Sequence, residues 1–235
     1  MSTMYIIRHG QASFGKENYD CLSDLGVRQA KLLGDYFKST GVTFDAVYSG
    51  SLDRQVATFR AVMERMPSNQ SSEKPIILME FNEVESFSDL MKLVATLAAE
   101  DPEVSAAVES INTDPHAFKK VYSRVMQRWA PNKSSENYLE SWKDISKRVQ
   151  TGIDRIRAEN GPGKRVAVFT SGGPIAATMQ IALDLDDQSA IQLPRHIRNT
   201  AVSTFLYDDN RLSLLTYNSI AHLEIHNDPT LITFI

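Results

Sequence analysis

The sequence predicts an α/β fold, a three-layer sandwich with a mostly parallel central sheet, helices on both faces and a helical lid insertion. Short apolar runs that suit strands alternate with longer segments whose apolar residues recur at helical spacing. Several runs pass directly into small or charged residues and then a helix, which is typical of parallel βα units. Residues 201–207 and 211–217 are predicted to form a hairpin at the sheet edge. The length of 235 residues can bury a sizeable core, so we expect one domain over 1–235 with a helical insertion at about 86–156.

The first predicted strand, Met4 to Ile7, is followed at once by Arg8, His9 and Gly10. Ligands of an open α/β sheet bind at the carboxyl ends of its strands. A neutral imidazole can attack phosphorus, a nearby cation keeps it neutral by lowering its pKa, and an arginine fork matches phosphate oxygens. These residues indicate a phosphate site with His9 as nucleophile. Taken alone, they fit a surface salt bridge and an ordinary loop histidine equally well.

A second strand and a second arginine follow. A polar loop over residues 11–20 leads to a helix for which Ser23 is the predicted N-cap and Gly41 the stop. A strand at residues 44–49 then runs through small residues to Arg54, near the start of another helix. Helix N-termini favour anions, so two strand ends that each deliver an arginine indicate an anion site. By itself, Arg54 is more often a solvated helix charge.

Acidic residues follow the third predicted strand, at residues 75–79. Glu80, Glu83 and Glu85 are candidates for a group that protonates a leaving alkoxide, which requires a raised pKa. The residues alone do not choose among the three, and an exposed carboxylate is the simpler interpretation of each.

The segment from about residue 86 to 156 is helical in pattern almost throughout. Asp101-Pro102, Asp114-Pro115 and Ala130-Pro131 divide it, since proline interrupts helices. Because it follows directly on a strand end, we expect a lid that selects substrate. The simpler alternative is that it only enlarges the core.

The clearest buried strand, residues 165–170, ends in the run Ser171-Gly172-Gly173-Pro174 and a further helix. The glycines let the backbone approach a ligand, and Pro174 suits a first helical turn. This is a third anion-friendly turn. A nucleophilic Ser171 is a competing hypothesis, but the Gly-x-Ser-x-Gly pattern is missing because Phe169 stands two residues before it.

Composition narrows the classes of function. The net charge of −4 and isoelectric point near 5.8 argue against nucleic acid as the main partner. Cys21 is the only cysteine, so we expect no intrachain disulfide and no multi-cysteine metal site. There is no leader and no apolar run of membrane-spanning length, which predicts a soluble, cytoplasmic protein without a membrane partner. His222 and His226 could form a metal pair, but structural or surface histidines are the expectation.

Several motifs, in order along the chain, resemble those of the histidine phosphatase superfamily, the phosphoglycerate-mutase-like proteins. The matching segments are Arg8-His9-Gly10, Leu22-Ser23-Asp24-Leu25-Gly26 with Gln29-Ala30, Val47 to Arg54 with Thr58, Asn82-Glu83, Glu140-Ser141-Trp142 with Arg148-Val149, and Asn218 with Ala221-His222-Leu223. The resemblance covers most of the chain and least of the helical stretch from about Phe87 to Asn137.

The resemblance implies roles for individual residues. It implies that His9 takes the phosphoryl group while Arg8 and Arg54 clamp its oxygens. It selects Glu83 as the acid for the leaving group and then the base for water. No metal and no cofactor are implied, and the expected partner is a small phosphorylated substrate or phosphate.

The chain departs from the family pattern at Ser171, where the family has a second histidine. A serine hydroxyl still donates a hydrogen bond but brings no charge. Losing a strong donor of this kind costs roughly a hundred- to a thousandfold in rate, or about 3–4 kcal/mol. Backbone N–H groups of Gly172 and Gly173 offset part of this loss. Gly15 also stands where mutases carry an asparagine, which favours a phosphatase over a mutase.

The leading hypothesis is a metal-independent phosphomonoester hydrolase, a phosphatase, acting through phospho-His9. The alternative is a phosphate-ester-binding or regulatory protein on the same scaffold, impaired by Ser171. A serine hydrolase that uses Ser171 is the third. The sequence names neither the substrate nor the oligomeric state.

Overall fold

The computed structural model describes residues 1–13, 20–67, 74–83, 87–111, 114–129 and 140–234. The strands are β1 (Ser2–Arg8), β2 (Ala46–Ser49), β3 (Ile76–Ile77), β4 (Arg165–Thr170), β5 (Val202–Tyr207) and β6 (Leu212–Ser219). The α-helices are α1 (Asp24–Ser39), α2 (Asp53–Met63), α3 (Phe87–Glu100), α4 (Pro102–Glu109), α5 (Pro115–Trp129), α6 (Trp142–Glu159), α7 (Gly172–Leu183), α8 (Asp187–Gln192) and α9 (Ala221–Glu224). Short 3-10 helices are η2 (Met79–Phe81), η3 (Pro194–His196) and η4 (Pro229–Leu231).

The strands form one sheet in the order β3-β2-β4-β1-β5-β6. β1 pairs with β4, β4 with β2 and β2 with β3, all parallel. β5 runs antiparallel to β1 and pairs with β6 in the predicted edge hairpin. The mostly parallel α/β sheet is therefore confirmed. Because the parallel strands share a direction, their carboxyl ends meet at one edge.

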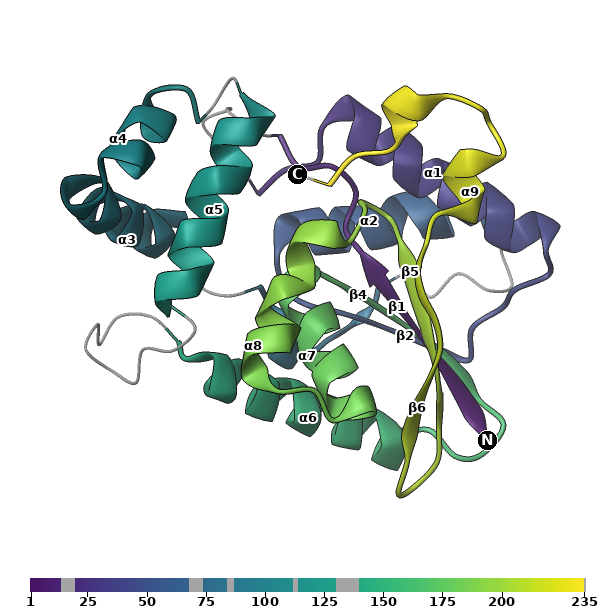
Figure 1. Cartoon of the computed structure of the whole chain (residues 1–235). Coiled ribbons are helices and arrows are strands. Elements are labelled where there is room, and N and C mark those ends of the chain that lie inside the picture. The colour runs from purple at the N-terminus through teal and green to yellow at the C-terminus, as the bar shows by residue number, and fades with distance from the viewer. Residues whose placement is uncertain (14–19, 68–73, 84–86, 112–113, 130–139, 235) are drawn as a thin grey trace.

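Helices cover both faces of this sheet, as the alternation of side chains along the strands requires. Met4 and Ile6 on β1 face a core shared with α6 and α7. Ile7 faces the opposite core, which α1 and α2 complete. In Figure 1, α1 and α2 lie above the sheet and α6 and α7 below it. All three β1 side chains are fully buried, and each such burial contributes roughly 1.5–3 kcal/mol.

The sequence signals that predicted the two ends of the first helix are present in the structure. The Ser23 hydroxyl accepts the Gly26 N–H at 3.0 Å, as an N-cap should. The helix ends at Ser39, and Gly41 follows with φ of +67°, a left-handed conformation that favours glycine.

The third strand is shorter than the predicted span of residues 75–79. β3 comprises only Ile76 and Ile77, which are 42% and 43% exposed, because it lies at the sheet edge with a single neighbour. The chain then turns into η2, where Phe81 is fully buried. A strand of apolar residues can lie at an edge as well as in the core, and short edge strands limit unwanted pairing.

Where the structure describes it, the predicted helical stretch contains the helices α3, α4, α5 and α6, which lie in two different parts of the fold. α3, α4 and α5 pack on one another through Leu93, Val104 and Val121, and Figure 1 shows them grouped at one side. α6 belongs instead to the layer under the sheet, where Ile145 and Ile153 join the main core. The division at about 86–156 and the lid role stay predictions. Within the described ranges, no helix is both long and apolar enough to cross a membrane.

Candidate active site

The ends of β1 and β4 lie side by side. Arg8 is in register with Thr170, and the His9 N–H donates to the Thr170 carbonyl at 2.8 Å. His9 and Ser171 therefore leave adjacent parallel strands at matching positions, about 5 Å apart in backbone spacing. The segments that the sequence analysis selected independently converge here because the strands are parallel.

His9 is 3% exposed, and both ring nitrogens have partners. Nδ1 lies 2.7 Å from the Gly10 carbonyl oxygen, and Arg54 Nε donates to His9 Nε2 at 3.3 Å. A carbonyl only accepts, so the proton sits on Nδ1 and the lone pair on Nε2. Burial, followed by the charges of Arg54 and Arg8, holds the pKa of His9 well below its ordinary value. The imidazole is thus neutral, and Nε2 is the atom able to act as a nucleophile.

The backbone of His9 is held by the segment before β5. The His9 carbonyl accepts from the Thr200 N–H at 3.2 Å and from Asn199 Nδ2 at 3.3 Å. The Thr200 hydroxyl donates to the Asn199 carbonyl at 2.7 Å and accepts from His222 Nε2 at 2.8 Å. His222 is buried, and desolvation lowers its pKa to about 3. His222 is therefore a structural residue behind His9, in agreement with the expectation for the C-terminal histidines.

Close packing requires a glycine at position 10, directly after His9. The Gly10 N–H donates to the Thr58 hydroxyl at 3.0 Å, and that hydroxyl donates to the Arg54 carbonyl at 2.7 Å. A Cβ at Gly10 would lie 2.5 Å from the Gly26 carbonyl oxygen, so a side chain does not fit. This contact fixes the turn that carries His9 against both α1 and α2.

The two arginines are oriented in different ways. Arg54 Nη1 donates to Asp20 Oδ1 at 2.6 Å, and the other Asp20 oxygen accepts the Asp53 N–H at 2.9 Å. Arg8 Nη1 instead donates to the carbonyls of Ile197 and Phe234. A carboxylate both orients and offsets a guanidinium charge, whereas a carbonyl orients it without cancelling the charge.

Glu83 reaches the first turn of α7. Its two carboxylate oxygens lie 3.2 and 3.3 Å from the Gly173 nitrogen, whose N–H they accept. A helix N-terminus favours such a negative group through its unpaired N–H groups and its dipole. Glu80 packs against Gly152 of α6 instead, and Glu85 lies outside the described residues. The geometry thus separates Glu83 from Glu80, while the prediction for Glu85 lies outside the described residues.

Ser171 is fully buried at the start of α7. Gln55 Nε2 donates to the Ser171 hydroxyl at 2.9 Å and to the Phe81 carbonyl at 3.1 Å. Gln55 Oε1 accepts the Leu52 N–H at 3.3 Å, which fixes the orientation of the amide. Ser171 therefore accepts in this contact, and its own proton stays available to another acceptor. Gly172 follows it in the helix turn whose N–H groups lack intrahelical partners.

Sequence reasoning did not identify Asp20, Gln55, Asn199 or Thr200. Asp20 is the last residue of the polar stretch 11–20 of the sequence, and Asn199 and Thr200 come from a segment about 190 positions after His9. Gln55 directly follows Arg54, which was the one available signal. Their roles depend on tertiary contacts that no local pattern carries.

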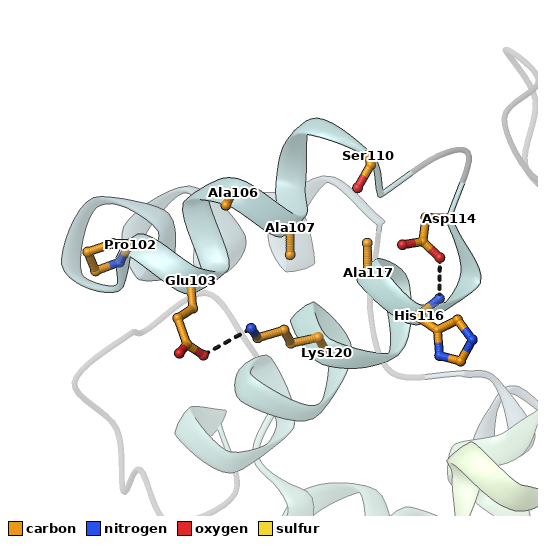
Figure 2. A pocket seen from close by; sticks show the side chains of 9 residues that line it. All are labelled: Pro102, Glu103, Ala106, Ala107, Ser110, Asp114, His116, Ala117 and Lys120. Carbon is orange, nitrogen blue, oxygen red and sulfur yellow. Dashed lines mark hydrogen bonds and ion pairs between the residues drawn. The ribbon is translucent and has the colours of Figure 1, made fainter.

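Two other histidines of the chain, His196 and His116, lie on other elements. His196 is exposed on η3. His116 begins α5 and lines an open pocket of about 560 Å³ between α4 and α5, where Lys120 pairs with Glu103 at 2.9 Å (Figure 2). The residues that line this pocket belong to α4, α5 and the turn between them, so the pocket forms no part of the candidate site.

A match to a protein-family model shows which family this chain belongs to. The model of the histidine phosphatase superfamily (branch 1) matches residues 4–110 and 106–220. The chain belongs to the histidine phosphatase superfamily. The family resemblance drawn from the strand-end motifs is thereby confirmed, and the matched residues include the stretch that the motifs covered least.

Curated relatives of this superfamily member include phosphoglycerate mutases. The 2,3-bisphosphoglycerate-dependent phosphoglycerate mutase of Treponema denticola is 25% identical over 205 residues, 81% of each chain. The enzyme of the same name from Bacteroides fragilis is 32% identical over 72 residues. That alignment spans 28% of this chain and only 29% of the relative's length.

Solved structures share the fold of this superfamily member at low identity. Phosphoglycerate mutase from Bacillus anthracis str. Sterne superimposes with a TM-score of 0.66 at 21% identity, covering 97% of both chains. A phosphoserine phosphatase mutant from Entamoeba histolytica, in complex with phosphoserine, gives a TM-score of 0.64 at 16% identity. That match covers 95% of this chain and 100% of the other. At these identities the matches establish the fold alone.

Proposed function

We propose that this histidine phosphatase superfamily member is a metal-independent phosphomonoester hydrolase that acts through a phosphohistidine on His9. The observation that carries the proposal is the 3.3 Å contact in which a buried, neutral imidazole presents Nε2 to the Arg54 guanidinium. A phosphoryl group that enters between these two side chains meets the nucleophile and a cation together. Arg8, adjacent in sequence, supplies a second guanidinium.

The first chemical step forms the phosphohistidine. The lone pair of His9 Nε2 forms the N–P bond while the P–O bond to the alcohol breaks. Glu83 in its protonated form gives its proton to the departing alkoxide and becomes a carboxylate. Arg8, Arg54, the Gly172 N–H and the Ser171 hydroxyl stabilise the charge on the phosphoryl oxygens.

The second step releases phosphate. The Glu83 carboxylate accepts a proton from water as the water oxygen forms a new bond to phosphorus. The N–P bond breaks, its electron pair returns to His9 Nε2, and inorganic phosphate leaves. His9 and Glu83 are then in their starting protonation states, so each cycle consumes one phosphomonoester and one water and releases one alcohol and one phosphate.

Gln55 supports the role proposed for Ser171. Because Gln55 occupies the acceptor side of the hydroxyl at 2.9 Å, the proton of Ser171 is directed to another acceptor, which we assign to a phosphoryl oxygen. The positive charge of the family's histidine is absent from this side. The catalytic loss is then limited to the charge, while one hydrogen-bond donor is retained.

A second candidate function is a phosphate-ester-binding protein with impaired catalysis. It is favoured by the same residue, since the Ser171 hydroxyl supplies no charge to a transition state. Both candidates predict binding of small phosphorylated ligands, as the structural neighbour with phosphoserine does. They differ only in turnover.

The test is turnover of a panel of phosphomonoesters, including an activated aryl phosphate, without added metal. We expect wild-type activity that falls at least about a thousandfold in His9→Ala, since removing a nucleophile leaves only residual catalysis. His196→Ala is the matched control, because His196 is an exposed histidine outside the site. Equal turnover by wild type and His9→Ala would overturn the proposal, and tight phosphate binding without turnover would favour the second candidate.

A further inference from the structure

A cluster of basic side chains lies beside the candidate site without a role in the steps above. Arg195, His196 and Arg198 fall within four positions, on η3 and just after it. Arg198 is the partly buried member, and its guanidinium carbon lies 5.1 Å from the centre of the Phe234 ring. In the part of the chain that the structure describes, no ion pair involves Arg198.

This arrangement differs from that of another arginine of similar burial. Arg148 pairs with both oxygens of Glu140, at 2.7 and 3.0 Å. Desolvating part of a guanidinium is costly unless an anion or hydrogen-bond acceptor compensates. The Phe234 ring attracts the face of the Arg198 guanidinium but leaves the N–H groups at its edge unused. Arg198 is thus oriented for an acceptor supplied from outside the chain.

The position of Arg198 relative to the phosphate site is fixed by Arg8. Arg8 Nη1 donates to the carbonyl of Ile197, the residue before Arg198. The same nitrogen donates at 3.0 Å to the carbonyl of Phe234, the residue on which Arg198 stacks. The backbone beside Arg198 and the backbone of Phe234 are therefore both bound by the arginine that ends β1.

Phe234 directly follows Thr233, which is bound to the rest of the fold by several hydrogen bonds. The Thr233 hydroxyl accepts from Gln29 at 2.8 Å and donates to Asn199 Oδ1 at 2.8 Å. The Asn199 N–H donates to the Thr233 carbonyl at 2.9 Å. Asn199 also contacts the His9 carbonyl, so the C-terminal segment and the nucleophile share one network. Phe234 accordingly lies beside the carboxyl end of β1.

We propose that Arg198, stacked on Phe234 beside Arg8, is a second anion subsite, and that the preferred substrates are phosphomonoesters carrying a further anionic group. This inference rests on the proposed function of the His9 site. The phosphoryl group binds between His9, Arg8 and Arg54, and the second anion accepts hydrogen bonds from the edge of the Arg198 guanidinium. A carboxylate and a second phosphate share this chemistry.

The test compares substrates that differ only in the second anion. 3-Phosphoglycerate and glycerol 3-phosphate differ in a carboxylate, and fructose 1,6-bisphosphate and fructose 6-phosphate differ in a phosphate. We expect wild-type kcat/KM to favour the doubly anionic member of at least one pair by about tenfold, the factor typical of a hydrogen bond to a charged group. The pair that shows the preference identifies the source of the anion.

Arg198→Gln should reduce this preference by about tenfold through KM, and Arg198→Lys should retain part of it. Arg195→Gln is the matched control, because Arg195 is exposed on the neighbouring turn, and it should keep the preference. Phe234→Leu, which removes the aromatic surface and keeps an apolar side chain, should weaken the preference even if Arg198→Gln fails to fold.

Calorimetric titration of both ligand pairs distinguishes this inference from the proposed hydrolysis. If the wild type turns over no ester, the proposed function fails, while tighter, Arg198-dependent binding of the doubly anionic ligand still supports the subsite. Equal affinity for both members of each pair, or a preference that Arg198→Gln leaves intact, overturns the subsite whatever the turnover.

Discussion

The ends of β1 and β4 are neighbours in the sheet but present opposite chemistry. β1 ends in Arg8 and is followed by His9, and Arg54 joins these two groups from α2. After β4, Ser171 and the first turn of α7 present neutral donors, and the Glu83 carboxylate is bound there. In our account the β1 side handles the charge of the phosphoryl group and the α7 side handles the proton.

Of the substitutions that test this division between phosphoryl charge and proton transfer, Glu83→Gln is expected to have the largest effect. Glutamine can still accept the Gly173 N–H but cannot deliver a proton, so alkyl phosphate turnover should fall roughly a hundred- to ten-thousandfold. An aryl phosphate, whose leaving group needs no proton, should lose far less. Steady-state kinetics on both esters measure the contrast, and an equal loss on the two would place the proton chemistry elsewhere.

Arg54→Gln should come next, with roughly a hundred- to a thousandfold loss in kcat, because it removes charge stabilisation on the β1 side. It should also change the pH profile. The reactive form of His9 is neutral, and the Arg54 charge helps to lower its pKa, so without Arg54 that pKa rises. The acid limb of kcat/KM should therefore move to higher pH than in the wild type, on the same substrate.

Arg60→Gln is a suitable control for that variant, because Arg60 lies exposed on the same helix. An unchanged acid limb in Arg54→Gln would show that Arg54 does not act on His9.

A smaller effect is expected at the β4 end. Ser171→Ala should lower kcat about tenfold, because it removes a neutral donor and leaves the Gln55 amide without one acceptor. In Gln55→Glu a carboxylate oxygen replaces the amide that donates to Ser171. The Ser171 hydroxyl should then donate to this oxygen, and kcat should fall by a similar factor. Ser171→Thr should restore most of the activity. If Ser171→Ala kept the full wild-type kcat, the stabilisation of the phosphoryl oxygens would come entirely from the β1 side and from backbone N–H groups.

The smallest effect concerns stability behind His9. Burial lowers the pKa of His222 to about 3, below the roughly 6.5 expected when unfolded. Below pH 6.5 the unfolded chain binds a proton at His222 that the folded chain does not bind. The free energy of unfolding therefore decreases as the pH is lowered, by up to about 1.4 kcal/mol per pH unit. Urea denaturation between pH 7.5 and pH 5 should show a shallower fall for His222→Gln than for the wild type.

His196→Gln serves as the control for that measurement, because His196 is an exposed histidine on η3. If His222→Gln and wild type lost stability in parallel on acidification, His222 would titrate alike in both states, contrary to the account.

The sequence was sufficient for the features that strand direction dictates. Parallel βα units bring strand ends together, which is why the sequence predicted that Arg8, His9 and Arg54 lie near one another. The residues alone left three candidate acids open, and the family resemblance selected Glu83, which reaches α7.

The features that the sequence did not predict depend on contacts between segments that are distant along the chain. Gln55 acquires its role only when Ser171 lies against it, and the His9 carbonyl meets Asn199 across nearly the whole chain. The length of β3 depends likewise on its edge position, because the apolar run that predicted a longer strand is the same for edge and central strands.

The most direct measurement of the central claim is the chemical identity of the covalent intermediate. The enzyme is mixed with a good aryl phosphate substrate, quenched in base, where phosphohistidine survives, and mapped by peptide mass spectrometry. The account predicts phosphate on His9, formed within one turnover and absent from His9→Ala. Turnover with phosphate on Ser171, or with no phosphorylated peptide at all, would contradict it.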